Sequence, residues 1–266
     1  MKTFLTILSL AIIVSACNNS TDENTELPEQ EKNLKTEIKK FPDSVVLKEN
    51  LIQYYADNSN YTQAIAEIDK FIQKDTANPR WWDLKANLYF QNNDTLNTIK
   101  SFERAIEIFP NPEYIISLGT VYAQTRNPMA LTMADALLQA PKAQAELQAL
   151  YIKGLYYNYT GDHNKAIPFF DECIRMNYTF MDSYVEKAVA YYEMGKYETA
   201  LQVVQKGMAI QPTFFDGYYW AGRCYEKLNK RDEAIKHYQM AIQTAAQADL
   251  DYIEAKDALG KLGVKY

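Results

Sequence analysis

The chain has 266 residues, 47% of them hydrophobic and 23% charged, a composition typical of folded globular proteins and not of disordered or collagen-like chains. Its formal net charge is -6, with 28 Lys and Arg against 34 Asp and Glu and no basic run, which disfavours a nucleic-acid-binding surface. Three Cys and two His are too few for a disulfide framework or a typical zinc site, so we expect neither metal nor cofactor.

Residues 1–16 have the pattern of a secretory signal peptide. Lys2 precedes an apolar run at 4–14, and that run is shorter than the roughly 20 residues that a membrane-spanning helix needs. The run ends in Val14-Ser15-Ala16-Cys17, which resembles the lipobox of bacterial lipoproteins. The resemblance implies cleavage before Cys17 and lipidation, including palmitate, that anchors the chain to a membrane. The alternative is a plain secretory signal with an incidental cysteine.

The residue after the cysteine bears on which membrane is expected. Asn18 stands where an Asp commonly retains lipoproteins in the inner membrane, so the resemblance favours the outer membrane, on its periplasmic or its surface face. Residues 17–31 are polar and acidic and are expected to form a flexible tether. Alternatively, this acidic stretch resembles a surface-export signal of some Bacteroidota lipoproteins. Residues 32–44 are expected to form a single N-terminal helix that ends near Pro42.

A repeat of about 34 residues runs through residues 45–248. A small residue is followed three positions later by Tyr in five successive copies: Ala86 with Tyr89, Gly119 with Tyr122, Gly154 with Tyr157, Ala188 with Tyr191 and Gly222 with Tyr225. A second ladder of mostly small residues follows about twelve positions after the first: Ala64, Thr98, Ala130, Ala166, Ala200 and Ala234. A fixed period of this length indicates stacked supersecondary units.

The pattern resembles the tetratricopeptide repeat (TPR) family, most clearly in the second copy, with Trp82, Ala86, Tyr89, Thr98, Phe102, Ala105 and Pro110. The resemblance implies an all-α solenoid: six helical hairpins over 45–248 in a right-handed superhelix, closed by a capping helix at 249–266. Tyr157 is expected to be a large buried anchor, whose replacement by Ala costs about 3–5 kcal/mol. Pro168 is expected to kink or delay the second helix of the fourth repeat.

Residues that could carry chemistry do not form a catalytic pattern. His163 and His237 lie two repeats apart, and each is expected to be solvated or to pack locally. Cys173 and Cys224 are expected to be small buried hydrophobes. The sequence has no glycine-rich phosphate loop, nucleophile elbow or paired His-Glu metal motif. We therefore predict that the protein is not an enzyme.

In the TPR family the first helix of each hairpin lines a groove that binds partners. We assign the groove-facing positions of the family to this sequence. In the N-terminal half of the groove these residues are polar: Glu49, Gln53, Asp57, Arg80, Asp83, Asn87 and Gln91. The C-terminal half is apolar and aromatic at Tyr151, Leu155, Asn158, Tyr159, Val185, Val189, Tyr192, Tyr219 and Arg223. Aromatic anchors suit a peptide or an amphipathic helix. The alternative is that these tyrosines pack against the neighbouring repeat.

Three triplets of Asp, Ser or Thr and an apolar residue resemble the O-glycosylation acceptors of exported Bacteroidota proteins. They contain Ser44, Thr76 and Thr95, each near a predicted turn. Helix N-capping explains such residues equally well, since Asp, Ser and Thr are favoured at that position.

These patterns together predict a lipid-anchored TPR adaptor that binds a protein or peptide partner at the bacterial envelope. Two other functions stay open. One is a self-assembling structural protein, in which an end of the array caps another copy. The other is a glycan-binding module that uses the aromatic residues of the groove.

Overall fold

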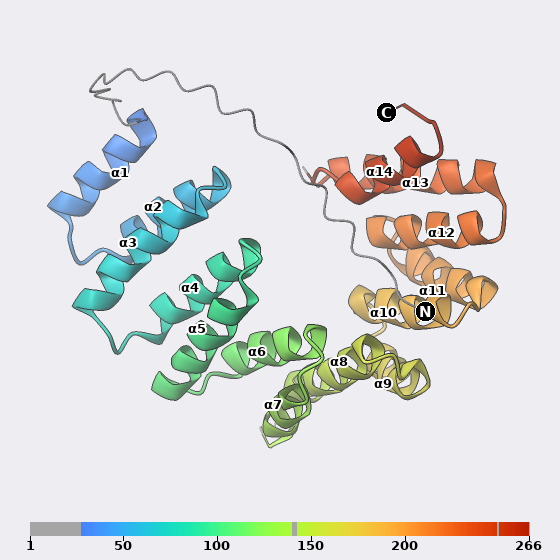
Figure 1. Ribbon diagram of the computed structural model, residues 1–266, viewed down its shortest axis with the longest axis horizontal. Coiled ribbons are helices and arrows are strands. Elements are labelled where there is room, and N and C mark those ends of the chain that lie inside the picture. The colour runs from blue at the N-terminus through green and yellow to red at the C-terminus, as the bar shows by residue number, and fades with distance from the viewer. Residues whose placement is uncertain (1–27, 140–142, 249, 266) are drawn as a thin grey trace, which may run out of the picture. The chain divides into compact units, whose positions relative to one another are not determined.

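The computed structural model describes residues 28–139, 143–248 and 250–265, and within these residues the protein has fourteen helices and no strand (Figure 1). This confirms the all-α solenoid that the repeat predicts. The described residues divide between two compact units, one that ends at Tyr54 and one that begins at Tyr55. Across the described ranges, no helix combines the length and the apolar character that crossing a membrane requires.

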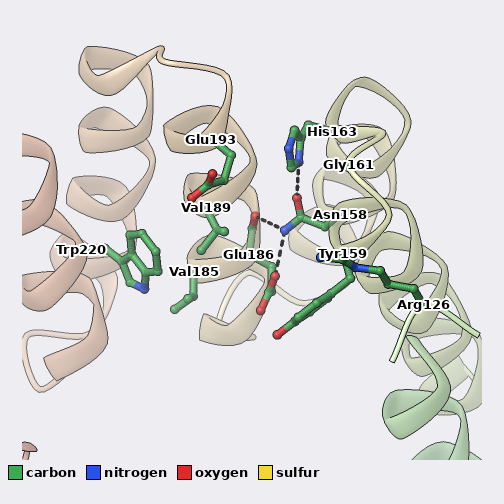
Figure 2. A pocket seen from close by; sticks show the side chains of 10 residues that line it. All are labelled: Arg126, Asn158, Tyr159, Gly161, His163, Val185, Glu186, Val189, Glu193 and Trp220. Carbon is green, nitrogen blue, oxygen red and sulfur yellow. Dashed lines mark hydrogen bonds between the residues drawn. The ribbon is translucent and has the colours of Figure 1, made fainter. Parts of the chain in front are cut away.

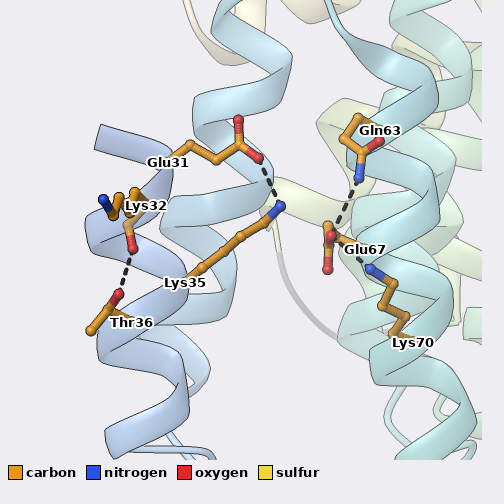
Figure 3. Close-up of polar contacts among 7 residues, drawn as sticks. All are labelled: Glu31, Lys32, Lys35, Thr36, Gln63, Glu67 and Lys70. Atoms are coloured by element: carbon orange, nitrogen blue, oxygen red, sulfur yellow. Dashed lines mark hydrogen bonds and ion pairs between the residues drawn. The ribbon is translucent and has the colours of Figure 1, made fainter. Parts of the chain in front are cut away.

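In the first unit, α1 (Glu29–Lys40) has acidic residues in its first turn and lysines in its last, which complements the helix dipole. Glu31 and Lys35 form an ion pair of 2.7 Å along this helix (Figure 3). The helix begins three residues before the expected 32 and ends at Lys40, so the last part of the expected tether is helical. The signal peptide, Cys17 and the rest of the tether lie outside the described residues.

By sequence order, α2 to α13 are the six predicted helix pairs. Their bounds are α2 (Val45–Asp57), α3 (Tyr61–Lys74), α4 (Pro79–Gln91), α5 (Thr95–Ile108), α6 (Pro112–Gln124), α7 (Met129–Leu138), α8 (Ala143–Tyr159), α9 (His163–Met176), α10 (Met181–Glu193), α11 (Tyr197–Ile210), α12 (Phe215–Lys227) and α13 (Arg231–Ala246). The last helix, α14 (Ile253–Lys261), packs on α13 inside the expected capping segment. Its Leu259 is buried, whereas Ile253 is exposed.

Each of the six hairpin turns contains one residue with a left-handed backbone. These residues are Ser59, Asn93, Arg126, Gly161, Gly195 and Asn229, with φ between 56° and 85°. Gly and Asn adopt this conformation most readily, which explains why they recur at the turns. Ser59 and Arg126 are neither Gly nor Asn, so the left-handed backbone costs more at these two positions.

The small residues of the repeat let the two helices of a hairpin approach closely. The second ladder is fully buried at every rung. A Cβ atom built on Gly154 would lie 2.6 Å from the Phe170 ring, and one built on Gly222 would lie 2.6 Å from the Tyr238 ring. Both rings are themselves buried, so the large residue of the second helix fills the space that the glycine leaves.

Two expectations about the fourth repeat are corrected. Pro168 lies inside α9, which begins at His163 and continues to Met176, so the expected delay of the helix is wrong, while the alternative of a kink stays a prediction. Tyr157 is only half-buried; its ring stacks on Phe169 at 5.7 Å. Phe170, one position further along α9, is the buried anchor, because it points at Gly154 on the facing helix.

Ion pairs join three hairpins to the next at equivalent positions. Lys85 contacts Asp69 at 2.5 Å, Lys153 contacts Asp135 at 2.7 Å, and Lys187 contacts Asp171. In each pair the lysine precedes the small residue of a first helix, and the aspartate lies on the second helix of the preceding hairpin. Such partly exposed pairs contribute modestly to stability. They also occupy the lysines of α8 and α10, the helices that form the site described below.

Polar contacts along α3 show how a buried carboxylate is satisfied in this array. Glu67 is buried and accepts hydrogen bonds from Gln63, at 3.3 Å, and from Lys70, at 2.8 Å (Figure 3). Both partners lie on the same helix, three or four residues away, a spacing that brings side chains together.

Candidate binding groove

A pocket of about 520 Å³ lies on the face formed by the first helices of three hairpins, α8, α10 and α12 (Figure 2). We call it the groove pocket; its lining residues are Arg126, Asn158, Tyr159, Gly161, His163, Val185, Glu186, Val189, Glu193 and Trp220. All of them belong to the second unit. Because the lining comes from four separate repeats, the pocket exists only when the repeats are stacked.

A hydrogen-bonded chain fixes the polar side of the groove pocket. The amide nitrogen of Asn158 donates to the carboxylate of Glu186 at 2.9 Å and to the Glu186 main-chain oxygen at 3.2 Å. The amide oxygen of Asn158 lies 2.7 Å from Nδ1 of His163, which therefore carries a proton and donates. Asn158 is only 6% exposed, so its hydrogen bonds hold the Glu186 side chain of α10 in place from the neighbouring helix α8 (Figure 2).

The remaining walls are apolar and aromatic. Val185 and Val189 lie one turn apart on α10, and Trp220 faces them from α12. Tyr159 is 38% exposed and stands at the α8 edge (Figure 2). A pocket with apolar walls and a few fixed polar groups can bind a side chain and orient it.

Among the carboxylates of this face, Glu186 is partly buried, whereas Asp182 and Glu193 are exposed. Burial raises the pKa of Glu186, the negative charge of Asp182 raises it further, and the Asn158 hydrogen bond opposes both effects. The pKa of Asp182 is raised by desolvation and by Asp216. Because its pKa is raised on folding, ionised Glu186 opposes folding. This penalty is absent below the unfolded pKa and is fully present once the pH exceeds the folded pKa.

A second pocket, of about 530 Å³, adjoins Trp220 on the side of the C-terminal helices. Tyr192, Tyr219, Arg223, Glu226, Lys227, Tyr238, Glu254, Ala258 and Lys261 line it. The Arg223 guanidinium lies 4.7 Å from the Tyr192 ring centre and 4.6 Å from that of Trp220. These cation–π contacts hold Arg223 in one place.

The structure brings most of the predicted groove residues together. Asn158, Tyr159, Val185 and Val189 line the groove pocket, and Tyr192, Tyr219 and Arg223 line the second pocket. Two predicted residues line neither: Leu155 is 2% exposed, and Tyr151 packs edge-on against Phe180 at 5.0 Å. Tyr192 is 7% exposed, so only its edge reaches a pocket. As a surface residue for a partner, Leu155 is therefore wrong, whereas Tyr151 is partly buried and its role stays a prediction.

The third repeat explains this difference. Gly119 and Ala130 lie 11 positions apart, where the corresponding residues of the other repeats lie 12 apart, and its second helix α7 has only 10 residues. The first helices α6 and α8 pack directly against each other there, and Leu155 belongs to the hydrophobic cluster that includes Val121 and Tyr122 of α6. The side of α8 that would face a partner in a regular repeat is thus partly covered.

Asp182 and Asp216 are acidic residues near the groove pocket that the sequence analysis did not single out. Each is the second residue of a first helix, and the two lie 34 positions apart. The period that reveals the hydrophobic ladders would have found them, had it been applied to charged residues as well.

The remaining candidate residues lie elsewhere. Cys173 and Cys224 are buried and free, and burial raises the pKa of Cys173 to about 11 and of Cys224 to about 12, so neither is a reactive thiolate. Across the described chain, no three His, Cys, Asp or Glu side chains converge as a metal site would require.

The candidate acceptors of O-glycans lie at helix starts and turns. The Ser44 hydroxyl accepts a hydrogen bond from the Leu47 amide at 3.4 Å, as a capping residue does. Asp94 caps α5 by accepting from the Asn97 amide at 3.1 Å, and its neighbour Thr95 is exposed. Thr76 is exposed between α3 and α4. Glycosylation of these residues stays a prediction.

Comparison with known proteins identifies the repeat. Family models described as tetratricopeptide repeat match residues 191–262 and, separately, 80–112 and 147–180, together about half of the chain. The crystal structure of a tetratricopeptide repeat protein from Parabacteroides merdae ATCC 43184 is similar, with a TM-score of 0.72 and 20% identity over 87% of this chain and 90% of that one. The crystal structure of PilW, a type IV pilus biogenesis factor, has a TM-score of 0.58 and 20% identity over 80% of this chain and 97% of that one.

Similarity to curated proteins is partial. Human superkiller complex protein 3 is 27% identical over 133 residues, which are 50% of this chain and 8% of that protein. The chain spans between 8% and 27% of the lengths of the first curated relatives that it matches. At these identities the solved structures show a shared fold, and the shared fold is a solenoid of helical hairpins.

Proposed function

The chain belongs to the tetratricopeptide repeat family, and from this premise we propose that it is an adaptor without catalysis of its own, which holds a segment of a protein partner on the face formed by α8, α10 and α12. The observation that carries the proposal is the groove pocket, where Val185, Val189, Tyr159 and Trp220 form an open apolar wall. Proteins of this family generally mediate protein–protein interactions, which supports the proposal.

Site-specific photocrosslinking tests this proposal. A photoreactive amino acid at Val189 or Tyr159 is expected to capture a partner in cells, because both side chains line the groove pocket. The matched control position is Lys206, which is exposed on the second helix α11. Capture from Lys206 with none from Val189 or Tyr159 would contradict the proposal. A captured species of twice the chain's own mass would instead indicate self-assembly.

We also propose that a lipid on Cys17 attaches the adaptor to the bacterial envelope, at the outer membrane. The lipobox-like Val14-Ser15-Ala16-Cys17 supports this, and the acidic tether that follows would give the repeats reach from the membrane. Replacing Cys17 with Ser is expected to release the protein from the membrane fraction or leave it uncleaved. Membrane association and maturation that survive the replacement would exclude the anchor.

A further inference from the structure

Helices α8 and α10 offer no cation to the carboxylates of the groove pocket, and the two cations of α12 are placed elsewhere: Arg223 is stacked on two aromatic rings, and Lys227 lines the second pocket. Within the described residues, α8 and α10 each contain a single Lys or Arg. Lys153 pairs with Asp135 of α7, and Lys187 pairs with Asp171 of α9. Both lysines are therefore held against the preceding second helices and do not reach the pocket.

The carboxylates of α10 consequently lack ionic partners among the described residues. Glu186 is bonded through an amide group, that of Asn158. Glu193 lines the same pocket, and Asp182 lies one turn before Glu186. Asp182 is close enough to raise the pKa of Glu186, and Asp216 of α12 raises that of Asp182. Asp216, Asp182 and Glu186 therefore form a row of neighbouring carboxylates, and Glu193 adds a further acidic side chain to the pocket.

Two arginines lie near this face without neutralising it. Arg126 lines the pocket from the α6–α7 turn, on the side of Tyr159 away from Glu186 and Glu193 (Figure 2). Arg223 is stacked on Trp220 and Tyr192, and its guanidinium donates to the Tyr192 hydroxyl at 3.4 Å. Neither forms an ion pair with a carboxylate of α10 in the described part of the chain.

Negative charge beside apolar walls matches the side chains of Lys and Arg. Their methylene stems can cover apolar surface while the charged group meets a carboxylate. Val185, Val189 and Trp220 supply the apolar surface, and Glu186 and Glu193 supply the charge. A cation above Trp220 would gain a further cation–π contact.

We propose that the partner segment held in the groove is basic, and that one of its Lys or Arg side chains enters the groove pocket between Val189 and Trp220 to meet Glu186 and Glu193. This inference rests on the proposed function, because it names the chemistry of the segment that the adaptor binds. Fixed carboxylates on one face also select against acidic segments, since like charges repel.

A display experiment tests the inference separately from the proposed function. A random library of 16-residue peptides is selected on the immobilised full chain, and on a Glu186→Gln/Glu193→Gln chain in parallel. Peptides from the wild-type selection are expected to be rich in Lys and Arg, and the double variant is expected to lose that enrichment. Groove-bound peptides that are neutral or acidic would overturn the inference and leave the adaptor function standing. Failure to select any peptide would contradict both.

One selected peptide then gives a quantitative test by fluorescence anisotropy. Glu186→Gln is expected to weaken binding about tenfold, as for loss of one partly desolvated charge pair. Glutamine keeps an oxygen for the Asn158 amide, so the fold is preserved, which circular dichroism checks. The control is Glu198→Gln. Glu198 is exposed on α11, outside the groove pocket, so its replacement is expected to leave binding unchanged. Equal effects of the two variants would overturn the inference.

The same peptide with its Lys and Arg replaced by Met completes a double-mutant cycle, in which the charge is removed from the peptide, from Glu186, or from both. It is expected to bind wild type and Glu186→Gln equally, because the charge that Glu186 meets is gone. A Glu186→Gln effect that persists with the uncharged peptide would show that the residue acts through the fold, and would count against a cation in the pocket.

Discussion

Replacing Phe170 with alanine is expected to lower the free energy of unfolding by about 3–5 kcal/mol, the range for deleting a fully buried aromatic side chain. Phe170 is 0% exposed, and its ring fills the space above Gly154 and contacts Tyr151 edge-on at 6.0 Å. Urea unfolding followed by far-ultraviolet circular dichroism measures the loss. Because repeats are stabilised by their neighbours, the fourth hairpin is expected to unfold before the ends of the array.

The matched control is Tyr157→Ala, the neighbouring aromatic position that the repeat pattern favours. Tyr157 is half-buried, and Lys165 lies 5.5 Å from its ring, as expected of an aromatic at the surface. Its replacement is expected to cost about 1–2 kcal/mol. A larger loss for Tyr157→Ala than for Phe170→Ala would refute the assignment of Phe170 as the anchor.

Gly154→Ala tests the same contact from the opposite helix. The added methyl group would lie 2.6 Å from the Phe170 ring, so the change is expected to destabilise by about 1–3 kcal/mol. In a Phe170→Ala background the clash is absent, and alanine is expected to stabilise the helix by up to about 1 kcal/mol. This reversal of sign is a coupling that independent sites would not show.

The sequence predicts the fold well because each hairpin repeats one packing solution. Ala166 and Gly154 must be small since another helix passes directly over them, and that requirement returns every 34 residues. Periodicity cannot show which large residue fills the space opposite. Phe170 and Tyr238 do so in two hairpins, but neither belongs to the ladder of tyrosines that marks the repeat.

The groove is less predictable, because exposure on the first helices depends on how each repeat meets the next. Val185 and Val189 reach the groove pocket, whereas Leu155, at the same repeat position as Val189, is covered by α6. The cause lies in the third repeat, where the short helix α7 accompanies direct packing of α6 on α8, and the sequence pattern does not show this packing. Glu186 was missed because its role depends on Asn158, which lies on another helix.

Tyr192→Ala is expected to destabilise the protein by about 3 kcal/mol, although Tyr192 occupies a position that faces the groove in regular repeats. Tyr192 is 7% exposed and packs edge-on against Tyr197 at 5.2 Å and Trp220 at 5.5 Å. Its ring also supports Arg223, which would lose one of its two aromatic contacts. Thermal unfolding and urea titration measure the change.

Tyr159→Ala separates packing from partner binding. Tyr159 is 38% exposed at the edge of the groove pocket, so its loss is expected to change the free energy of unfolding by less than about 1 kcal/mol while weakening partner capture. Tyr192→Phe keeps the ring and removes only the 3.4 Å hydrogen bond to Arg223, so it is expected to retain nearly full stability. If Tyr192→Ala proved as stable as Tyr159→Ala, the ring would not be part of the helix packing, and Trp220 and Arg223 would need other support.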